Sequence, residues 1–344
     1  MRIAVDIMSG DAPAEELLKG ALKAHEDFKV EIVLVGAEEI VAPYADTENG
    51  IYTAFSKSVV EMTDDALAAV KEKTDSSMAI GAKLLKNGEA DAFVSPGNTG
   101  ALLGAATLTV RKIKGIRRPA IASIIPLEKP FILLDSGANT ELLPENMLQF
   151  AYMGAFYAEK VFGVERPKVA LLNNGTEETK GTELYRESYK LIKNSELNFV
   201  GNCEGRDIPF GFCDVLVCEG FAGNVALKLI EGMGKFMSNQ INGLFRKNIK
   251  TKLAYLLTRK GINDMRKKLD HKEYGGAPVL GIAKPVIKAH GSSDARGFYN
   301  AIKQAKVYAE SDIIGRIETS IAKIKEQSKD VRGDLNATAV SEAD

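Results

Sequence analysis

The sequence predicts an α/β fold in which a mainly parallel sheet is covered by helices on both faces. Short β-branched runs alternate with longer helical patterns over most of the 344 residues, which is the rhythm of βαβ units. Several of these runs are apolar throughout, as expected of strands that are buried on both faces. Several also end in a glycine-containing polar loop that opens a helix. We therefore expect a doubly wound sheet with a large buried core.

Seven apolar runs are the predicted strands. They begin at residues 2, 31, 91, 120, 131, 168 and 214, and read RIAVDI, EIVLVG, DAFVS, AIASII, FILLDSG, KVALLNN and DVLVCEG. Helices are predicted over residues 14–28, 76–87, 98–112, 144–162, 181–193, 224–245 and 295–327. Residues 1–330 are expected to form one domain, followed by a frayed tail over 331–344.

Composition narrows the class of protein. The formal net charge of −1 gives the whole molecule no electrostatic attraction to nucleic acid. Cys203, Cys213 and Cys218 form no C-x-x-C pair and have no neighbouring histidine, which predicts reduced, semi-buried thiols and no metal site. The amino-terminal residues lack the pattern of a secretion signal, and no apolar run reaches the roughly 18 residues of a membrane-spanning helix. We therefore expect a cytoplasmic protein.

A basic amphipathic segment over residues 236–272 predicts a protruding helical hairpin with its break near Lys260 and Gly261. Basic residues between positions 246 and 268 greatly outnumber the single acid, Asp264. Such a surface suits an anionic membrane or an acidic protein partner. The alternative is a helix whose apolar stripe packs in a dimer interface. The residues expected to make the contact are Lys252, Leu253, Leu256, Leu257, Arg259 and Lys260.

Four glycine-containing loops follow predicted strands, over residues 95–100, 135–140, 173–181 and 218–224. Loops at the carboxyl ends of parallel strands lie along one edge of a sheet, where ligands bind. Four such loops with Asn, Thr or Lys suggest donors gathered around an anion. The sequence has neither G-x-x-x-x-G-K-[ST] nor a G-x-G-x-x-G after its first strand, so a nucleotide is the less favoured anion. It also lacks the G-x-S-x-G of a serine nucleophile.

Each candidate for holding the anion also has a structural interpretation. Asn98 and Asn224 stand where residues cap helices, and Lys180 has Glu177 and Glu178 close by in sequence. His290 titrates in the physiological range if exposed, but it is equally suited to a structural role. The remaining candidates are Asp6, which either orients the site or makes a turn, and Thr99, Gly100, Gly223, Ser292 and Ser293.

The order of motifs resembles that of the PlsX family, the bacterial phosphate acyltransferases of phospholipid synthesis. The motifs are AVDIMSGD, SPGNTGALL, LLDSGAN, the Asn-Gly-x-Glu-x-x-Lys-Gly run, CEGFAGN, YGGAPVLG and VIKAHGSSD, and the likeness covers residues 2 to about 306. One motif departs from the family pattern Asp-Ala-Met-Gly-Gly-Asp-His-Ala-Pro. This sequence lacks the histidine, apparently by a one-residue deletion, and has Ser9 in place of the first glycine.

The resemblance implies both the reaction and its setting. PlsX-type enzymes transfer an acyl group from acyl carrier protein to inorganic phosphate, and the acyl phosphate feeds a downstream acyltransferase that acylates glycerol 3-phosphate. The family implies a homodimer with a Rossmann-like α/β/α sandwich similar to isocitrate dehydrogenase and phosphotransacetylase. It also implies peripheral membrane association and no metal or organic cofactor. In this reading Lys180 and helix N–H groups bind phosphate, Asn224 or nearby amides stabilise the oxyanion, and His290 manages the phosphate proton.

Three other functions compete with this interpretation. A phosphotransacetylase would act on a coenzyme A thioester, but a small coenzyme needs no basic hairpin. A non-catalytic scaffold would be compatible with the altered first motif. A nicotinamide-dependent dehydrogenase of the related fold predicts an aspartate cluster for a metal, which the sequence does not offer. The other histidines, His25 and His271, are expected to be exposed.

Overall fold

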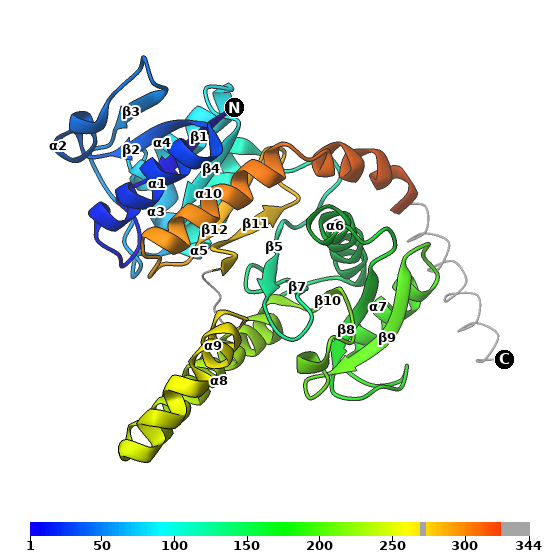
Figure 1. The fold of residues 1–344 in the computed structure, drawn as a ribbon. Coiled ribbons are helices and arrows are strands. Elements are labelled where there is room, and N and C mark those ends of the chain that lie inside the picture. Colours follow the sequence, from blue (N-terminus) through cyan, green and yellow to red (C-terminus); the bar gives the residue numbers. More distant parts are fainter. Residues whose placement is uncertain (269–272, 325–344) are drawn as a thin grey trace.

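Two β-sheets flanked by helices make up the protein in the computed structural model, which describes residues 1–268 and 273–324 (Figure 1). The predicted α/β class is confirmed. The sequence suggested one mainly parallel sheet, whereas the structure divides the strands between two sheets, each with antiparallel pairing toward one edge. The two sheets lie in separate halves of the ribbon (Figure 1), and helix α6 (Pro144–Phe162) packs against strands of the second sheet.

The first sheet contains the amino-terminal strands. Its members are β1 (Arg2–Asp6), β2 (Glu31–Gly36), β3 (Ile51–Phe55), β4 (Ala92–Ser95), β5 (Ala120–Ile121), β11 (Gly276–Leu280) and β12 (Val286–Ala289). The order is β3-β2-β1-β4-β12-β11-β5, and the five strands from β3 to β12 are parallel. The order of these parallel strands changes direction at β1: the chain proceeds from β1 to β2 and β3 on one side of β1, and then adds β4 on its other side. Such a switch point opens a crevice outside the carboxyl ends of the strands.

The second sheet has the order β6-β7-β10-β8-β9. Its members are β6 (Ser123–Ile125), β7 (Phe131–Leu134), β8 (Lys168–Asn173), β9 (Asn198–Glu204) and β10 (Val215–Val217). The run AIASII, predicted as one strand, is divided: Ala120–Ile121 pairs with β11 in the first sheet, and Ser123–Ile125 pairs with β7 in the second. This short run therefore carries the chain from one sheet to the other.

Most predicted helices are confirmed with shifted ends. The α-helices are α1 (Ala14–Phe28), α2 (Glu38–Val41), α3 (Ala66–Glu72), α4 (Ser77–Asn87), α5 (Thr99–Ala105), α6 (Pro144–Phe162), α7 (Glu183–Lys193), α8 (Gly220–Arg246), α9 (Ile249–Lys268) and α10 (Ala295–Ala309). The short turns are η1 (Ala42–Tyr44), η2 (Ala106–Val110), which is π-helical, and η3 (Ile208–Phe210). The helix predicted over 295–327 is interrupted at 310–312 and resumes over 313–324. The predicted tail lies outside the described residues.

Alternation along the strands places helices on both faces of each sheet. In β1, Val5 packs into the core formed with α1 and α10, whereas Ala4 packs with α4 and α5. In β7, Leu134 joins the same core as Val5, and Leu133 faces the cluster that includes Leu227 of α8. One continuous core thus runs between the two sheets. This shared core supports the predicted single domain over 1–330, and we keep that assignment as a proposal.

Helices α8 and α9 form the predicted hairpin, which projects away from both sheets (Figure 1). The predicted break at Lys260 and Gly261 is wrong, because the chain turns between α8 and α9 and Gly261 lies inside α9. Asn248 accounts for the difference, since its Oδ1 accepts a hydrogen bond from Thr251 N at 3.0 Å in the manner of a helix cap. A glycine inside a helix costs only about 1 kcal/mol, so the capping asparagine determines where α9 begins.

The start of α8 is fixed by close contact with the second sheet. Glu219 caps the helix by accepting hydrogen bonds from Phe221 N at 2.6 Å and Ala222 N at 2.8 Å. One turn later, Gly223 lies so close to the loop after β7 that a Cβ atom there would be 1.9 Å from the carbonyl oxygen of Asp135. Only glycine fits this approach without moving the helix or the strand.

We predict that Gly223→Ala strongly destabilises the protein, because either α8 or the loop after β7 must move. Gly232→Ala is the matched control, since a Cβ atom at Gly232 of the same helix would meet nothing within 4 Å. The control should raise the free energy of unfolding by roughly 0.5–1 kcal/mol through the better helix propensity of alanine. Urea-unfolding midpoints of both variants test this, and equal effects would contradict the proposed contact.

Candidate active site

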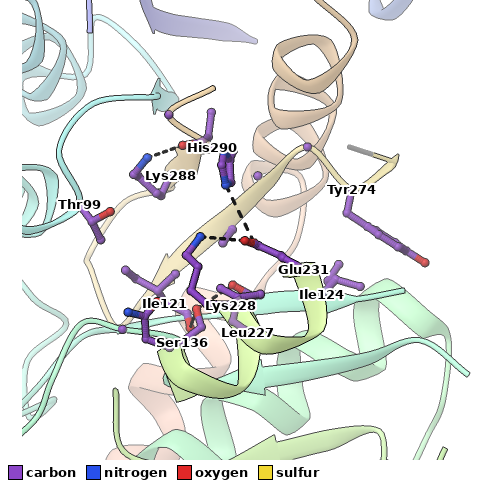
Figure 2. Close-up of a pocket in the computed structure, with 18 of the residues that line it drawn as sticks. Thr99, Ile121, Ile124, Ser136, Leu227, Lys228, Glu231, Tyr274, Lys288 and His290 are labelled. Atoms are coloured by element: carbon purple, nitrogen blue, oxygen red, sulfur yellow. Dashed lines mark hydrogen bonds and ion pairs between the residues drawn. The ribbon is translucent and has the colours of Figure 1, made fainter. Parts of the chain in front are cut away.

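A pocket of about 430 Å³ lies where loops of the first sheet meet helix α8 and the loop after β7. Its polar lining comes from Asp11, Thr99, Ser123, Ser136, Asn224, Lys228, Glu231, Tyr274, Lys288 and His290. Ile121, Ile124 and Leu227 contribute an apolar wall (Figure 2). The pocket thus occupies the crevice that the switch point between β1 and β4 predicts, with α8 as its opposite wall.

Three side chains of the pocket form a linked group that joins its two walls. On α8, Lys228 Nζ lies 2.9 Å from Glu231 Oε2. Across the pocket, His290 Nε2 lies 4.0 Å from Glu231 Oε1 (Figure 2). The Nδ1 of the same ring lies 3.0 Å from Ser292 Oγ. The carboxylate of Glu231 therefore stands between a lysine and a histidine.

Lys288 is a lysine in an otherwise apolar strand. Its neighbours in β12, Ile287 and Ala289, are fully buried. The side chain of Lys288 enters the pocket, and its Nζ donates hydrogen bonds to Pro96 O at 3.0 Å and to Ala289 O at 2.5 Å. An ammonium group has three N–H donors, and these contacts use two of them.

The electrostatic surroundings of Lys288 make it an unusual lysine. Burial lowers its pKa to about 8, and the nearby Lys228 lowers it as well, while Asp11 and Asp6 act in the opposite direction. Near neutral pH the group is therefore charged, but it loses its proton far more readily than an ordinary lysine. Strongly perturbed ionisable groups in a cleft are typical of functional sites.

Asp6, a predicted ligand residue, has a structural position behind the pocket. The side chain is fully buried. Its Oδ1 accepts hydrogen bonds from Met8 N and Ser9 N, each at 3.1 Å, and its Oδ2 accepts one from Ser95 Oγ at 2.7 Å. Asp6 thus joins the loops after β1 and β4, and among the described residues it does not line the pocket.

Asp135 holds the loop over residues 135–140 in a similar way. This buried carboxylate accepts backbone hydrogen bonds from Ile121 at 3.0 Å, Ala138 at 3.0 Å and Asn139 at 2.7 Å. Burial raises its pKa, and the donated hydrogen bonds oppose that rise. The loop presents Ser136 to the pocket and brings the backbone at Gly137 close to Asn224.

At the start of α5, Asn98 uses its side chain locally and Thr99 reaches the pocket. Asn98 Oδ1 accepts from Ala101 N at 3.1 Å, and its Nδ2 donates to Met62 O at 3.0 Å. The capping interpretation of Asn98 is therefore confirmed. Gly100 makes room for Ala66, because a Cβ atom there would lie 2.8 Å from the Cβ of Ala66.

The two serines after His290 likewise differ in their exposure and contacts. Ser292 is exposed and contacts His290, whereas Ser293 is buried, and its hydroxyl has no hydrogen-bond partner among the described residues. The cap of α10 is Asp294, which accepts from Gly297 N at 3.0 Å. The pocket thus gathers Thr99, Asn224 and His290 of the predicted set. Gly100, Gly223 and Ser292 are directly adjacent in sequence to lining residues, and Ser293 is one residue further.

Lys180 lies outside this pocket. Its loop, over residues 174–182, lines a separate apolar groove of about 1090 Å³ on the other side of α8. The amine is half-exposed and lies 3.9 Å from Glu177 Oε1. Three of the four predicted loops therefore contribute residues to the pocket, whereas the loop of Lys180 contributes to the groove. The role of Lys180 in phosphate binding stays a prediction.

The sequence interpretation missed Lys228, Glu231 and Lys288. For Lys288 a signal was present in the apolar run Val-Ile-Lys-Ala. Burying an ionisable side chain in such a strand costs free energy, which points to a functional role for the lysine. For Lys228 and Glu231 no local signal exists, since charged residues on a helix are ordinary. Only the packing of α8 turns these two toward the pocket.

The remaining predictions for histidine and cysteine have mixed outcomes. His25 is only partly exposed, and its ring contacts Val30 O at 2.8 Å, so its predicted full exposure is wrong. His271 lies outside the described residues. The free cysteines Cys203, Cys213 and Cys218 are buried. Burial raises the pKa of each thiol, which makes them poor nucleophiles.

Two kinds of feature are absent from residues 1–268 and 273–324. No group of three or more His, Cys, Asp or Glu side chains in this part of the chain is placed to hold a metal ion. No helix within these ranges is long and apolar enough to cross a membrane.

The class of protein follows from comparison of the whole fold. The structure resembles a phosphotransacetylase from Streptococcus pyogenes with a TM-score of 0.57 and 17% identity, covering 90% of this chain and 94% of that one. It also resembles a branched-chain phosphotransacylase from Enterococcus faecalis, with a TM-score of 0.54 and 16% identity over 90% and 99% of the chains. The fold is therefore of the phosphotransacetylase type, as predicted.

The family follows from the sequence comparison. Residues 1–316 match the family model described as "Fatty acid synthesis protein". A protein named Phosphate acyltransferase from Thermoanaerobacterium thermosaccharolyticum is 48% identical over 322 residues, which cover 93% of this chain and 97% of the relative. Another of that name from Anoxybacillus flavithermus is 44% identical over 329 residues, covering 95% and 100%. The chain belongs to this family, and the resemblance to PlsX proteins is confirmed.

We predict that Asp6→Ala lowers the free energy of unfolding by roughly 2–4 kcal/mol, because buried donors on Met8, Ser9 and Ser95 lose their acceptor. Asp11→Ala, in the same loop but exposed, should change it by less than about 0.5 kcal/mol. Chemical denaturation of both variants measures the difference. A small effect at Asp6 would rule out its role as the tie between the two loops.

Proposed function

We propose that this protein is a phosphate acyltransferase that transfers an acyl group from acyl carrier protein to inorganic phosphate, giving acyl phosphate for phospholipid synthesis. The observation that carries the proposal is the near full-length identity of 43–48% to proteins named Phosphate acyltransferase. The pocket supports it, since Lys228, Lys288 and His290 face a single cavity that suits an anion.

The reaction needs few parts. An oxygen of hydrogen phosphate attacks the thioester carbonyl carbon, a C–O bond forms, and the C–S bond breaks. The proton of the phosphate passes to the departing sulfur, so that acyl phosphate and a free thiol result. The protein must bind the phosphate, stabilise the oxyanion of the tetrahedral intermediate, and accommodate the proton in transit. A thiolate is a good leaving group, so no strong acid is required.

We assign these tasks to residues of the pocket. Asn224, at the first turns of α8 beside the loop of Gly137, offers its amide to the oxyanion. His290, held between Glu231 and Ser292, is placed to carry the phosphate proton. Thr99 and the amides near Gly291 complete the cavity wall. Lys180 contacts phosphate only if the acyl phosphate site extends from the pocket around the start of α8 to the groove beside the loop of Lys180. Substitution of Lys180 tests whether the site reaches that far.

The hairpin supports the proposed partners. In its outer half, Lys252, Arg259 and Lys260 are exposed, together with apolar side chains such as Leu256 at 65% and Leu257 at 88% exposure. Acyl carrier proteins and cytoplasmic membrane surfaces are both anionic, so this surface suits either. We propose a cytoplasmic protein that attaches peripherally to membranes, acts as a homodimer, and delivers acyl phosphate to a glycerol 3-phosphate acyltransferase.

The function is tested by incubating the purified chain with palmitoyl carrier protein, with and without phosphate, and trapping acyl phosphate with hydroxylamine. We expect phosphate-dependent product. Asn224→Ala should lower kcat by roughly 10²–10³-fold, because one oxyanion donor is lost. If the site extends around the start of α8, Lys180→Ala lowers kcat/KM as well, whereas Lys190→Ala, another exposed lysine of the second half, does not.

Substrate comparison separates the proposal from its competitors. Palmitoyl carrier protein should be turned over with a much higher kcat/KM than palmitoyl-coenzyme A. Preference for the coenzyme would favour a phosphotransacetylase instead. Absence of any phosphate-dependent product would leave the non-catalytic scaffold as the better interpretation and would rule out the enzyme.

We predict that Leu257→Asp weakens binding to anionic vesicles without reducing turnover of carrier-bound substrate in solution, because it places a charge among the exposed apolar side chains of α9. Co-sedimentation with phosphatidylglycerol vesicles measures the binding. Phe210→Asp, at a 74% exposed position outside the hairpin, is the control and should bind as the parent protein does. Unchanged binding of Leu257→Asp would show that the apolar side chains around Leu257 do not contact the membrane.

A further inference from the structure

We propose that Lys228 and Lys288, which enter the pocket from opposite halves of the protein, form a two-lysine clamp that binds the phosphate dianion. The inference rests on the proposed function and deepens it, because it assigns phosphate binding to two lysines to which the sequence analysis gave no role. Lys228 comes from α8, which packs on the second sheet, and Lys288 comes from β12 of the first sheet.

The geometry of Lys288 leaves one donor for a ligand. Its Nζ donates to Pro96 O and Ala289 O, and Pro96 lies at a junction of three loops. At this junction Asp11 N donates to Gly291 O at 2.8 Å, and a Cβ atom at Gly10 would lie 2.8 Å from Gly291 O and 3.3 Å from Pro96 O. The ammonium group is therefore held in place by tightly packed backbone. Its third N–H remains to donate to a ligand in the pocket that Lys288 lines.

Lys228 is anchored more loosely. Its side chain is 56% exposed, and its amine is held by Glu231 at 2.9 Å on the same face of α8 (Figure 2). The contact with Glu231 is a one-turn ion pair, which is worth only a few tenths of a kcal/mol in isolation. Such a lysine can turn toward an anion at little cost while its partner continues to face His290.

The charges of the two lysines favour an anion between them. Burial and the nearby Lys228 both disfavour the charged state of Lys288, as its lowered pKa reflects. A bound phosphate dianion removes this repulsion and adds charge-assisted hydrogen bonds to both amines. Because one lysine belongs to each half, the anion would also hold the two walls of the pocket together.

The comparison with Lys284 argues against a purely structural role for Lys288. Both lysines lie near β12, are partly buried, and donate to backbone carbonyls, with Lys284 Nζ at 2.8 Å from Leu85 O. Only Lys288 lines the pocket and lies near a second lysine. Its pKa of about 8 is low for a group that merely ties loops together.

The clamp has a defined pH dependence. The charged groups that face Lys288 are Lys228 on α8 and Asp6 and Asp11 in the loop after β1, with His290 next along its own chain segment. In the free protein Lys288 is protonated below about pH 8 and loses its charge above it. Phosphate affinity should therefore fall as the pH rises through 8, whereas phosphate itself remains a dianion there.

The test measures phosphate binding directly, by titration calorimetry without acyl substrate, and then the KM for phosphate. Lys288→Met and Lys228→Gln should each weaken binding and raise this KM by roughly 10- to 100-fold, because each removes a charge-assisted hydrogen bond. The KM for acyl carrier protein should change little. Matched controls are Lys284→Met, beside the same strand, and Lys235→Gln, an exposed lysine further along α8, and both should bind phosphate like the parent.

A second readout distinguishes the clamp from a structural role. At pH 8, phosphate binding should draw about half a proton onto Lys288, which appears as a dependence of the binding enthalpy on the ionisation enthalpy of the buffer. This uptake should disappear in Lys288→Met. If that variant does not fold, Lys228→Gln still decides the matter, because its side chain is exposed.

The outcomes separate the clamp from the proposed function. Phosphate binding that is unchanged in both variants overturns the clamp even if acyl phosphate forms. Binding that is lost in both variants supports the clamp even if the reaction proves to be a different one. A rise in the KM for acyl carrier protein alone would show that the lysines contact the phosphate of the carrier's prosthetic group instead, and would also overturn the inference.

Discussion

The buried carboxylate of Asp135 is the constraint on which the arrangement of the two halves depends. It accepts a hydrogen bond from Ile121 N of the first sheet and several from the loop that follows β7 of the second. The same loop receives the start of α8, because Gly220 N donates to Asn139 O at 2.6 Å and Gly223 lies against the Asp135 carbonyl. One residue thus fixes the crossing strand, the loop and the helix that together form one side of the pocket. A buried carboxylate with this many donors leaves little freedom for any of the three.

Helix α8 links the pocket to the projecting hairpin, and its two faces line different cavities. One face turns Asn224, Lys228 and Glu231 toward the pocket. The other carries an apolar stripe that includes Phe221, at 67% exposure, and Met233, and it lines the groove beside the loop of Lys180. Beyond the sheets, the helix continues into the projecting hairpin (Figure 1). A partner that docks on the hairpin therefore contacts the same helix that positions the proposed oxyanion donor.

The first motif departs from the PlsX pattern, and the contacts of Ser9 and Asp6 show how its loop keeps its shape. Ser9, where the family has glycine, is buried beneath Gly97, and its hydroxyl has no hydrogen-bond partner among the described residues. Its backbone N–H is held by Asp6, which also secures the loop after β4. The loop is thus kept in shape by Asp6, and the pocket retains His290 and the two lysines.

The sequence by itself determined the fold class, the hairpin, the loops and the family, because these depend on local periodicity, on glycine positions and on motif order. It placed Thr99, Asn224 and His290 in one pocket correctly, since loops at the carboxyl ends of strands share an edge of a sheet. Only the tertiary structure divided AIASII between two sheets, separated Lys180 from the pocket, and brought Lys228 of α8 to face Lys288 of β12. Those outcomes depend on how distant segments pack, and the spacing of residues along the chain carries no information about that packing.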